Sequence, residues 1–266
     1  MSDTPAIILC GATGATGNAV AHALARIESG VHLTALVAPS VASTPTRALP
    51  ADVLAFATLE EALKASPDAT VVVDFTHAEP ALAHAELALA HRLPIIVGAT
   101  GFADADLEQL GERFAAADLA LLHVPNFSLG AVLLMRVATE LVRHFPDVEI
   151  IETHHDGKRD SPSGTSVLAA RRIAAARHDA GLQPGPGSAS AGTGSGRGTL
   201  VDGVPIHALR LPGATAHQEV VFGGTGELLT IRHDAIDRSS YAAGVARAAH
   251  GVAALRGLVT GLDAVL

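Results

Sequence analysis

The chain has 266 residues, 48% of them hydrophobic and 17% charged, which is enough for one large or two ordinary domains with a substantial core. A net charge of −9 without a basic stripe argues against nucleic acid as a main partner. The sequence contains no uninterrupted apolar run of ~18 residues, so we expect no transmembrane helix. Cys10, the single cysteine, lies in an apolar run, so we expect no disulfide framework. The N-terminus lacks the features of a secretory signal, so we expect a cytoplasmic location and no membrane partner.

The first half of the chain alternates short apolar runs with helical segments. Runs that are apolar throughout are typical of strands in a parallel sheet that is covered on both faces. The runs occupy residues 6–10, 31–37, 51–56, 70–75, 94–99 and 119–124, and the helical segments occupy residues 18–28, 59–66, 79–92 and 103–117. This pattern predicts a doubly wound, Rossmann-like α/β domain.

A glycine-rich turn, GATGATG, follows the first apolar run and contains Gly11, Gly14 and Gly17. Glycines at such a turn allow a pyrophosphate to approach the N-terminus of the following helix closely. We therefore expect a dinucleotide cofactor, and a plain strand-to-helix turn is the structural alternative.

The second apolar run ends in Ala38-Pro39-Ser40, where dinucleotide-binding domains usually carry an acid that binds the ribose hydroxyls. Without that acid a 2′-phosphate is not repelled, so NADPH is favoured over NADH. The nearby groups that could bind the 2′-phosphate are Ser40, Ser43, Thr44 and Arg47.

Ligands in such sheets lie beyond the carboxyl ends of the strands. The fourth and fifth runs end near Phe75-Thr76 and Gly98-Ala99-Thr100, so Thr76, Gly98 and Thr100 are expected to contact the nicotinamide or the substrate. Structural turns are the alternative at each position.

The pattern changes after Pro125, where we expect the domain boundary. A helix over residues 129–144, strands over 148–154, 205–211, 217–223 and 227–235, and a loop over 181–198 are predicted, followed by a helix over 241–255 that packs on the first domain. The last two strands should form a hairpin in an open mixed sheet, whose exposed face is most simply covered by self-association. The predicted domains are residues 1–126 with 241–266, which bind the dinucleotide, and residues 127–240, which bind substrate and form the oligomer.

Residues 152–166, ETHHDGKRDSPSGTS, carry the densest set of functional side chains. A helix is predicted to begin near Pro162, so that the N–H groups of Ser163, Gly164 and Thr165 are unpaired and point at an anion, with Lys158 as an added cation. These donors suit a carboxylate. His154 and His155 should point to opposite faces of a strand end, and one of them could donate a proton. Taken singly, each feature is more often a helix cap, a solvated lysine or a structural histidine.

These segments together resemble the dihydrodipicolinate reductase (4-hydroxy-tetrahydrodipicolinate reductase) family of bacterial lysine and diaminopimelate synthesis. The resemblance covers essentially the whole chain in order. The matching motifs are E-x-H-H-x-x-K-x-D-x-P-S-G-T at residues 152–165, DFT at 74–76, GATGF at 98–102, PNFS at 125–128 and GELLTIRHDAIDRSSYAAG at 226–244.

The resemblance implies a role for each matching residue. His154 is implied as the proton donor, and Lys158 as a second acid and a ligand of a substrate carboxylate. The implied dicarboxylate contacts are His155, Ser163, Gly164, Thr165 and Thr100. The implied cofactor contacts, taken with the strand ends, are Gly11, Thr13, Gly14, Ala15, Thr16, Gly17, Phe75, Thr76, Gly98, Thr100, Val124, Asn126 and Phe127. No metal is implied, and members are usually homotetramers built through the second-domain sheet.

Two departures from the family pattern concern the adenosine end of the cofactor. Ala15-Thr16 stands where the family has Arg-Met, and the acid or arginine after the second strand is absent. We therefore expect NAD(P)H-dependent reduction of a cyclic imine dicarboxylate, with a lean toward NADPH that rests on the missing acid and not on the resemblance. The alternatives are a catalytically silent NADP-binding regulator and, more remotely, a zinc hydrolase. The proton-donor motif argues against the first, and the absence of HExxH or cysteine-rich spacing against the second.

Overall fold

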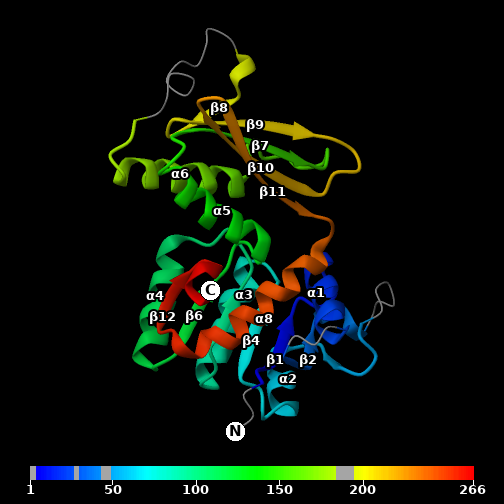
Figure 1. The fold of residues 1–266 in the computed structure, drawn as a ribbon. Coiled ribbons are helices and arrows are strands. Elements are labelled where there is room, and N and C mark those ends of the chain that lie inside the picture. Colours follow the sequence, from blue (N-terminus) through cyan, green and yellow to red (C-terminus); the bar gives the residue numbers. More distant parts are fainter. Residues whose placement is uncertain (1–3, 27–29, 43–48, 184–194) are drawn as a thin grey trace. The chain divides into compact units, whose positions relative to one another are not determined.

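The chain folds into two compact units. The computed structural model describes residues 4–26, 30–42, 49–183 and 195–266. The first unit comprises Met1–Leu129 and Arg238–Leu266, and the second comprises Gly130–Asp237. The boundaries expected from the sequence, after residues 126 and 240, lie close to these positions. Figure 1 shows the elements of each unit.

A seven-stranded sheet forms the centre of the first unit, in the order β12-β6-β5-β4-β1-β2-β3, and every neighbouring pair is parallel. The predicted doubly wound sheet is therefore confirmed. The strands are β1 (Ala6–Cys10), β2 (His32–Val37), β3 (Leu54–Phe56), β4 (Val71–Asp74), β5 (Ile95–Val97), β6 (Ala120–His123) and β12 (Gly257–Thr260). Every residue of β1, β4 and β5 is buried, as expected for strands covered on both faces.

Helices cover this sheet, and the chain returns to it at its C-terminal end. The helices are α1 (Ala15–Arg26), α2 (Leu59–Ala65), α3 (Ala78–Ala90), α4 (Asp104–Ala116) and α8 (Tyr241–Gly251). Helix α8 belongs to the first unit, where it contacts α1. The sequence did not predict β12, which pairs with β6 as the seventh strand. Short 3₁₀ turns complete this unit at Pro39–Ala42, Arg238–Ser240, Val252–Ala254 and Leu262–Val265.

The second unit is an open mixed sheet of five strands in the order β11-β10-β7-β9-β8, as predicted. The strands are β7 (Asp147–His154), β8 (Thr199–Val201), β9 (Val204–Arg210), β10 (Ala216–Gly224) and β11 (Glu227–Ala235); the helices are α5 (Leu129–Leu141) and α6 (Gly164–Asp179), and a 3₁₀ turn spans Ser195–Arg197. Strands β10 and β11 form the expected hairpin, and β7 pairs in parallel with β9. The sequence did not predict the short strand β8.

One face of this sheet is buried and the other is open. In β7 the buried residues are Val148, Ile150 and Glu152, and the residues between them are half-buried. Helix α6 packs on the sheet at β9, β7 and β8 (Figure 1). Among the residues described, none of the helices has the length and apolar character that crossing a bilayer requires.

Candidate active site

The end of β7 places a histidine beside a buried carboxylate. His154 is the last residue of the strand, and Glu152, two residues earlier, lies on the same face. The Nδ1 atom of His154 and Oε2 of Glu152 form a hydrogen bond, and the His154 side chain is 15% exposed. His155 follows the end of the strand and is exposed in the loop, so the expectation of two opposite strand faces does not apply to it.

Glu152 is fully buried and accepts hydrogen bonds from three different residues. Arg210 donates from Nη1 to Oε2 and from Nη2 to Oε1, both at 2.9 Å, and the backbone N–H of Ser163 donates to Oε1 at 3.2 Å. Burial raises the pKa of Glu152, but the hydrogen bonds from His154 and Arg210 outweigh it and bring the pKa below its usual value. Glu152 is therefore ionised at neutral pH.

Helix α6 begins two residues later than the sequence suggested. Gly164 is its first residue and Ser163 is the N-cap, whose hydroxyl accepts from the N–H of Ser166 at 3.2 Å. Pro162 therefore precedes the cap and lies outside the helix. The side-chain cap explains why the helix begins where it does.

The expectation that the N–H groups of Ser163 and Gly164 are unpaired is wrong. Ser163 donates to Glu152, and Gly164 donates to Oδ2 of Asp160 at 3.3 Å. Carboxylates of the chain accept from these N–H groups at the helix start, where the lack of intrahelical acceptors and the helix dipole favour negative charge. Thr165 lies in the first turn of α6 and is half-buried.

Asp160 also binds the lysine that the sequence analysis singled out. Its Oδ1 atom lies 2.8 Å from Nζ of Lys158, and the hydrogen bond from Lys158 brings the pKa of Asp160 below its usual value. The structure thus brings together Lys158 and the Gly164 N–H on one carboxylate. The sequence analysis predicted that these two donors bind a carboxylate of a ligand.

The predicted cofactor turn in the first unit has the close backbone approaches that glycine permits. Gly11 has φ +80°, and a Cβ atom there would lie 2.7 Å from the carbonyl oxygen of Phe75. A Cβ atom at Gly17 would lie 2.2 Å from the carbonyl oxygen of Gly11. Ala15 and Thr16, the departures from the family pattern, are the first residues of α1. Backbone packing therefore requires glycine at positions 11 and 17, and a pyrophosphate contact at this turn stays a prediction.

Three of the predicted cofactor residues from different strand ends lie in contact. The rings of Phe75 and Phe127 have centroids 5.1 Å apart, and a Cβ atom at Gly98 would lie 2.8 Å from the Phe127 ring. Phe127 and Val124 are buried, whereas Thr100 is exposed. The Oδ1 atom of Asn126 accepts from the N–H of Ser128 at 2.8 Å. These residues lie beyond the carboxyl ends of β4, β5 and β6, where sheets of this kind bind ligands.

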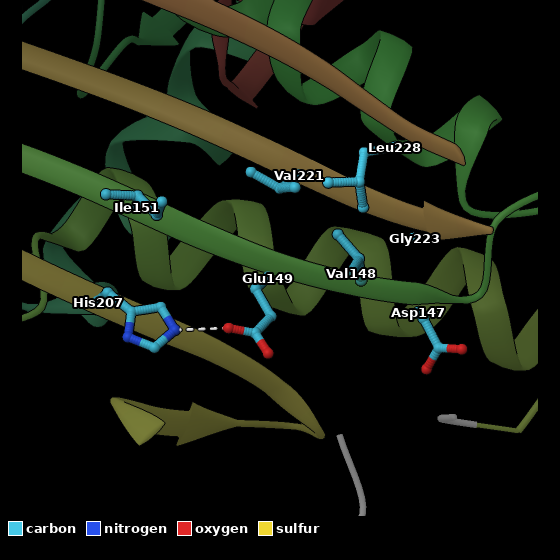
Figure 2. Close-up of a pocket in the computed structure, with 8 residues that line it drawn as sticks. All are labelled: Asp147, Val148, Glu149, Ile151, His207, Val221, Gly223 and Leu228. Atoms are coloured by element: carbon cyan, nitrogen blue, oxygen red, sulfur yellow. Dashed lines mark hydrogen bonds and ion pairs between the residues drawn. The ribbon is translucent and has the colours of Figure 1, made fainter. Parts of the chain in front are cut away.

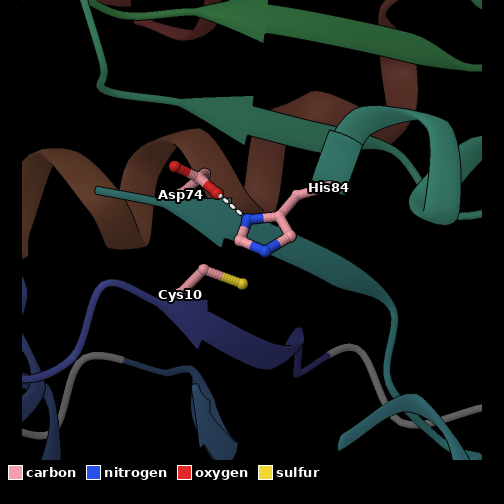
Figure 3. Close-up of side chains that lie close together, drawn as sticks. All are labelled: Cys10, Asp74 and His84. Atoms are coloured by element: carbon pink, nitrogen blue, oxygen red, sulfur yellow. Dashed lines mark hydrogen bonds and ion pairs between the residues drawn. The ribbon is translucent and has the colours of Figure 1, made fainter. Parts of the chain in front are cut away.

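A buried cluster of Cys10, Asp74 and His84 supports the turn after β4, and Figure 3 shows the three side chains together. Their potential ligand atoms lie within 4.8 Å of one another. Burial and the nearby Asp74 raise the pKa of the Cys10 thiol well above its usual value. The oxygens of Asp74 accept from Nδ1 of His84 at 2.6 Å and from the N–H and hydroxyl of Thr76 at 2.8 and 2.6 Å. We therefore assign the cluster to holding Thr76 in place.

The predicted 2′-phosphate site is described only in part. The hydroxyl groups of Thr13 and Ser40 lie 2.8 Å apart, which joins the glycine turn to the residues after β2. Ser43, Thr44 and Arg47 lie outside the described residues. The same holds for residues 184–194 of the predicted loop.

A pocket of about 480 Å³ lies on the second-unit sheet away from Glu152 and His154. Figure 2 shows Glu149 and His207 at this pocket, joined by a hydrogen bond of 2.6 Å. Glu149 and Ile151 of β7 alternate with the buried residues of the strand, so the pocket belongs to the open face. The pocket does not include the histidine and lysine of the predicted site.

Sequence reasoning did not assign roles to Glu152, Asp160, Arg210 and Asp74. The two-residue spacing of Glu152 and His154 at a strand end could have shown that they share a face. Arg210 is 58 residues from Glu152 in the sequence, so no local signal joins them.

Comparisons with known proteins give one consistent result. Residues 5–127 match the family model described as "Dihydrodipicolinate reductase, N-terminus", and residues 130–266 match "Dihydrodipicolinate reductase, C-terminus". The chain is 44% identical over 200 residues, 75% of its length, to 4-hydroxy-tetrahydrodipicolinate reductase of Mycolicibacterium gilvum, of which 81% is covered. It is 44% identical over 196 residues, 74% of its length, to the reductase of the same name from Geobacillus thermodenitrificans, of which 73% is covered.

A solved structure agrees with the sequence comparisons. Dipicolinate-bound dihydrodipicolinate reductase from Paenisporosarcina sp. TG-14 is 34% identical and superimposes with a TM-score of 0.83. The match covers 99% of this chain and 100% of that one.

Proposed function

This chain belongs to the dihydrodipicolinate reductase family, as its motifs predicted, and we propose that it reduces the cyclic imine dicarboxylate 4-hydroxy-tetrahydrodipicolinate to tetrahydrodipicolinate with NAD(P)H. The activity is the one that its relatives are named for. The Paenisporosarcina relative, which matches along nearly the whole chain, binds dipicolinate, a flat dicarboxylate related to the substrate.

One observation supports a role for particular residues in this activity. The carboxylate of Asp160 binds both Lys158 Nζ and the Gly164 N–H. These donors bind a carboxylate of the chain itself, so they have the position and charge to bind one from a ligand. Charge-assisted hydrogen bonds of this kind are roughly twice as strong as neutral ones. Ser163, Thr165 and His155 lie next to them in the chain, and we propose them as further contacts of the dicarboxylate, together with Thr100 of the first unit.

The reaction removes the 4-hydroxy group of the substrate as water and adds one hydride and one proton to the ring, so that the products are tetrahydrodipicolinate, NAD(P)+ and water. Bound NAD(P)H supplies the hydride. We propose that His154 or Lys158 supplies the proton, and that the lysine ammonium and the helix start neutralise substrate carboxylate charge and orient the ring.

The cofactor is a nicotinamide dinucleotide, and we propose that NADPH is used at least as well as NADH. Support comes from Ala38-Pro39-Ser40 at the end of β2, where no carboxylate repels a 2′-phosphate. Dissociation constants for both cofactors, measured at one salt concentration, test the preference. A tenfold preference for NADH, equivalent to ~1.4 kcal/mol, would show that the missing acid does not control it.

The open face of the second-unit sheet supports a homotetramer. This face carries the half-buried Ile151 and the pocket shown in Figure 2. We propose that partner subunits cover it, which light scattering of the purified protein tests. A cytoplasmic location remains our prediction, to be tested by cell fractionation.

The enzymatic assay follows oxidation of NADPH and of NADH with freshly made product of dihydrodipicolinate synthase. Lys158→Ala should lower kcat/KM by about 100-fold or more, because it removes a charge-assisted contact and a candidate acid. Lys64→Ala is the matched control, because Lys64 forms an exposed pair with Glu60 at 2.7 Å in α2. Dinucleotide binding without turnover in the wild type would instead favour a silent regulator, and near wild-type kcat/KM in a folded Lys158→Ala variant would contradict the site.

A further inference from the structure

We propose that Glu152 is a positioning residue that holds His154 with its hydrogen on Nδ1 and its Nε2 atom available to the ligand, and that Arg210 holds Glu152 in its ionised form. The importance of this for turnover rests on the proposed function. The central claim, which ring nitrogen carries the hydrogen, concerns the protein without substrate and can be tested separately.

The strand register places the three side chains together. Glu152 and His154 lie two residues apart on β7, and Arg210 of the parallel strand β9 is the register partner of His154. The guanidinium of Arg210 reaches both oxygens of Glu152 at 2.9 Å. Such bidentate contact fixes the carboxylate plane as well as its position.

The hydrogen bonds determine the tautomer of His154. The Glu152 carboxylate has about four acceptor positions. It receives four donors: Nη1 and Nη2 of Arg210, the Ser163 N–H and Nδ1 of His154. An ionised carboxylate has no hydrogen to give, so Nδ1 must donate. Nε2 is then the nitrogen at which the ring can gain or lose a proton.

Arg210 also holds the loop that carries Lys158. Its Nη2 atom donates to the backbone oxygen of Asp160 at 2.6 Å, and its Nη1 atom donates to the oxygen of Leu209 at 2.6 Å. A buried carboxylate without a cation would take up a proton and could then donate to the histidine instead. The arginine therefore keeps Glu152 an acceptor and ties it to the loop.

The consequence for catalysis is that only one nitrogen of His154 exchanges protons with substrate. If Glu152 loses its charge, the ring can rotate or take the other tautomer, and the fraction of molecules ready to donate falls. This loss lowers kcat. It leaves Lys158 and the Gly164 N–H, which hold the dicarboxylate, in place.

Nitrogen NMR of ¹⁵N-histidine-labelled protein tests the tautomer directly. The His154 signals are assigned by their loss in His154→Asn, and spectra are recorded at a pH where the ring is neutral. Hydrogen on Nδ1 in the wild type and its redistribution in Glu152→Gln are the expected results. Hydrogen on Nε2 in the neutral wild-type ring, or the same spectrum in Glu152→Gln, would overturn the proposal whether or not the protein reduces the substrate.

Kinetics distinguish positioning from a purely structural role. Glu152→Gln should lower kcat at least about tenfold, with the dipicolinate dissociation constant little changed. If this variant does not fold, Glu152→Gln with Arg210→Met removes both charges and should show the same loss of kcat. Glu86→Gln is the control, because Arg113 donates to both Glu86 oxygens in an exposed pair on the first unit. Wild-type kcat, or an equal loss of kcat and dipicolinate affinity, would overturn the proposal.

Discussion

Asp160 occupies the two donors that we assign to a substrate carboxylate. Its contact with Lys158 joins side chains that are 55% and 23% exposed, respectively. Exposed pairs contribute only about 0.2–1 kcal/mol, so a dicarboxylate can displace Asp160 at small cost. A carboxylate of the chain thus holds the lysine near the helix start until the ligand binds.

Asp160→Asn should therefore tighten dipicolinate binding, by up to about fivefold, because the competing negative charge is removed. Calorimetric titration of the folded variant measures this. Asp156→Asn removes the same charge from an exposed position in the same loop and controls for the change in net charge. Equal affinities in the two variants would mean that Asp160 does not compete with the ligand.

Glu152 should make the stability of the second unit depend on acid pH. Its pKa in the folded protein is lowered, so its contribution to stability is present above its unfolded pKa of ~4.3 and is lost as pH falls through the lower folded value. Glu152→Gln leaves Arg210 unpaired and should melt at a lower temperature at pH 7. The difference in melting temperature between wild type and variant should shrink as pH falls below the unfolded pKa and disappear below the lowered folded pKa. A constant difference in melting temperature from pH 7 to acid pH contradicts this assignment.

At the scale of elements, the end of β7 and the start of α6 form the dicarboxylate site as one structure. Glu152 of the strand binds the N-cap residue of the helix, and the loop between them supplies Lys158 and Asp160. Gly164 is the first helical residue, and a Cβ atom there would meet no heavy atom within 4 Å among the described residues. The fold thus has room for a side chain at this position.

Gly164→Ala should fold normally and bind dipicolinate about tenfold more weakly, because its methyl group enters the space through which a carboxylate approaches the N–H group. Overpacking by a methyl group typically costs about 1–3 kcal/mol. Gly196→Ala is the matched control, since a Cβ atom there also meets nothing within 4 Å among the described residues. Fluorescence or calorimetric titration compares them, and unchanged affinity in Gly164→Ala would exclude close approach of the ligand to this turn.

At the scale of the whole molecule, the proposed ligands bind to different units. The dinucleotide residues belong to the first unit, and the dicarboxylate residues, apart from Thr100, belong to the second. Hydride transfer requires the two ligands to meet. The chain passes between the units at residues 129–130 and 237–238, so we propose that these crossings form a hinge that closes on substrate.

Closure predicts that the ligands bind cooperatively. Dipicolinate should bind at least about tenfold more tightly with reduced cofactor present, and cofactor affinity should rise by the same factor because coupling is reciprocal. Calorimetric titrations with each ligand, alone and with the other saturating, measure both factors. Lys158→Ala should bind cofactor normally but lose the coupling. If each ligand binds with the same affinity whether or not the other is present, the hinge proposal is wrong.

The sequence by itself determined the doubly wound sheet, the hairpin of the second unit and the family. Short runs of β-branched residues such as residues 71–73, repeated between helical segments, indicate strands that are buried on both faces, and the motif at residues 152–165 is long enough to be specific. It also placed Lys158 beside a helix start, because all of these features lie within one local segment. The strands it missed, β8 and β12, have three and four residues and carry too little periodicity to be recognised.

Only the tertiary structure decided how the site is held. The cap at Ser163 sets the start of α6, Asp160 takes the donors expected to be free, and Arg210 reaches Glu152 from another strand. Local patterns encode which residues form a strand or helix. Which carboxylate each donor binds depends instead on the strand register and on the order of the strands in the sheet. Both bring together residues that are far apart in the sequence.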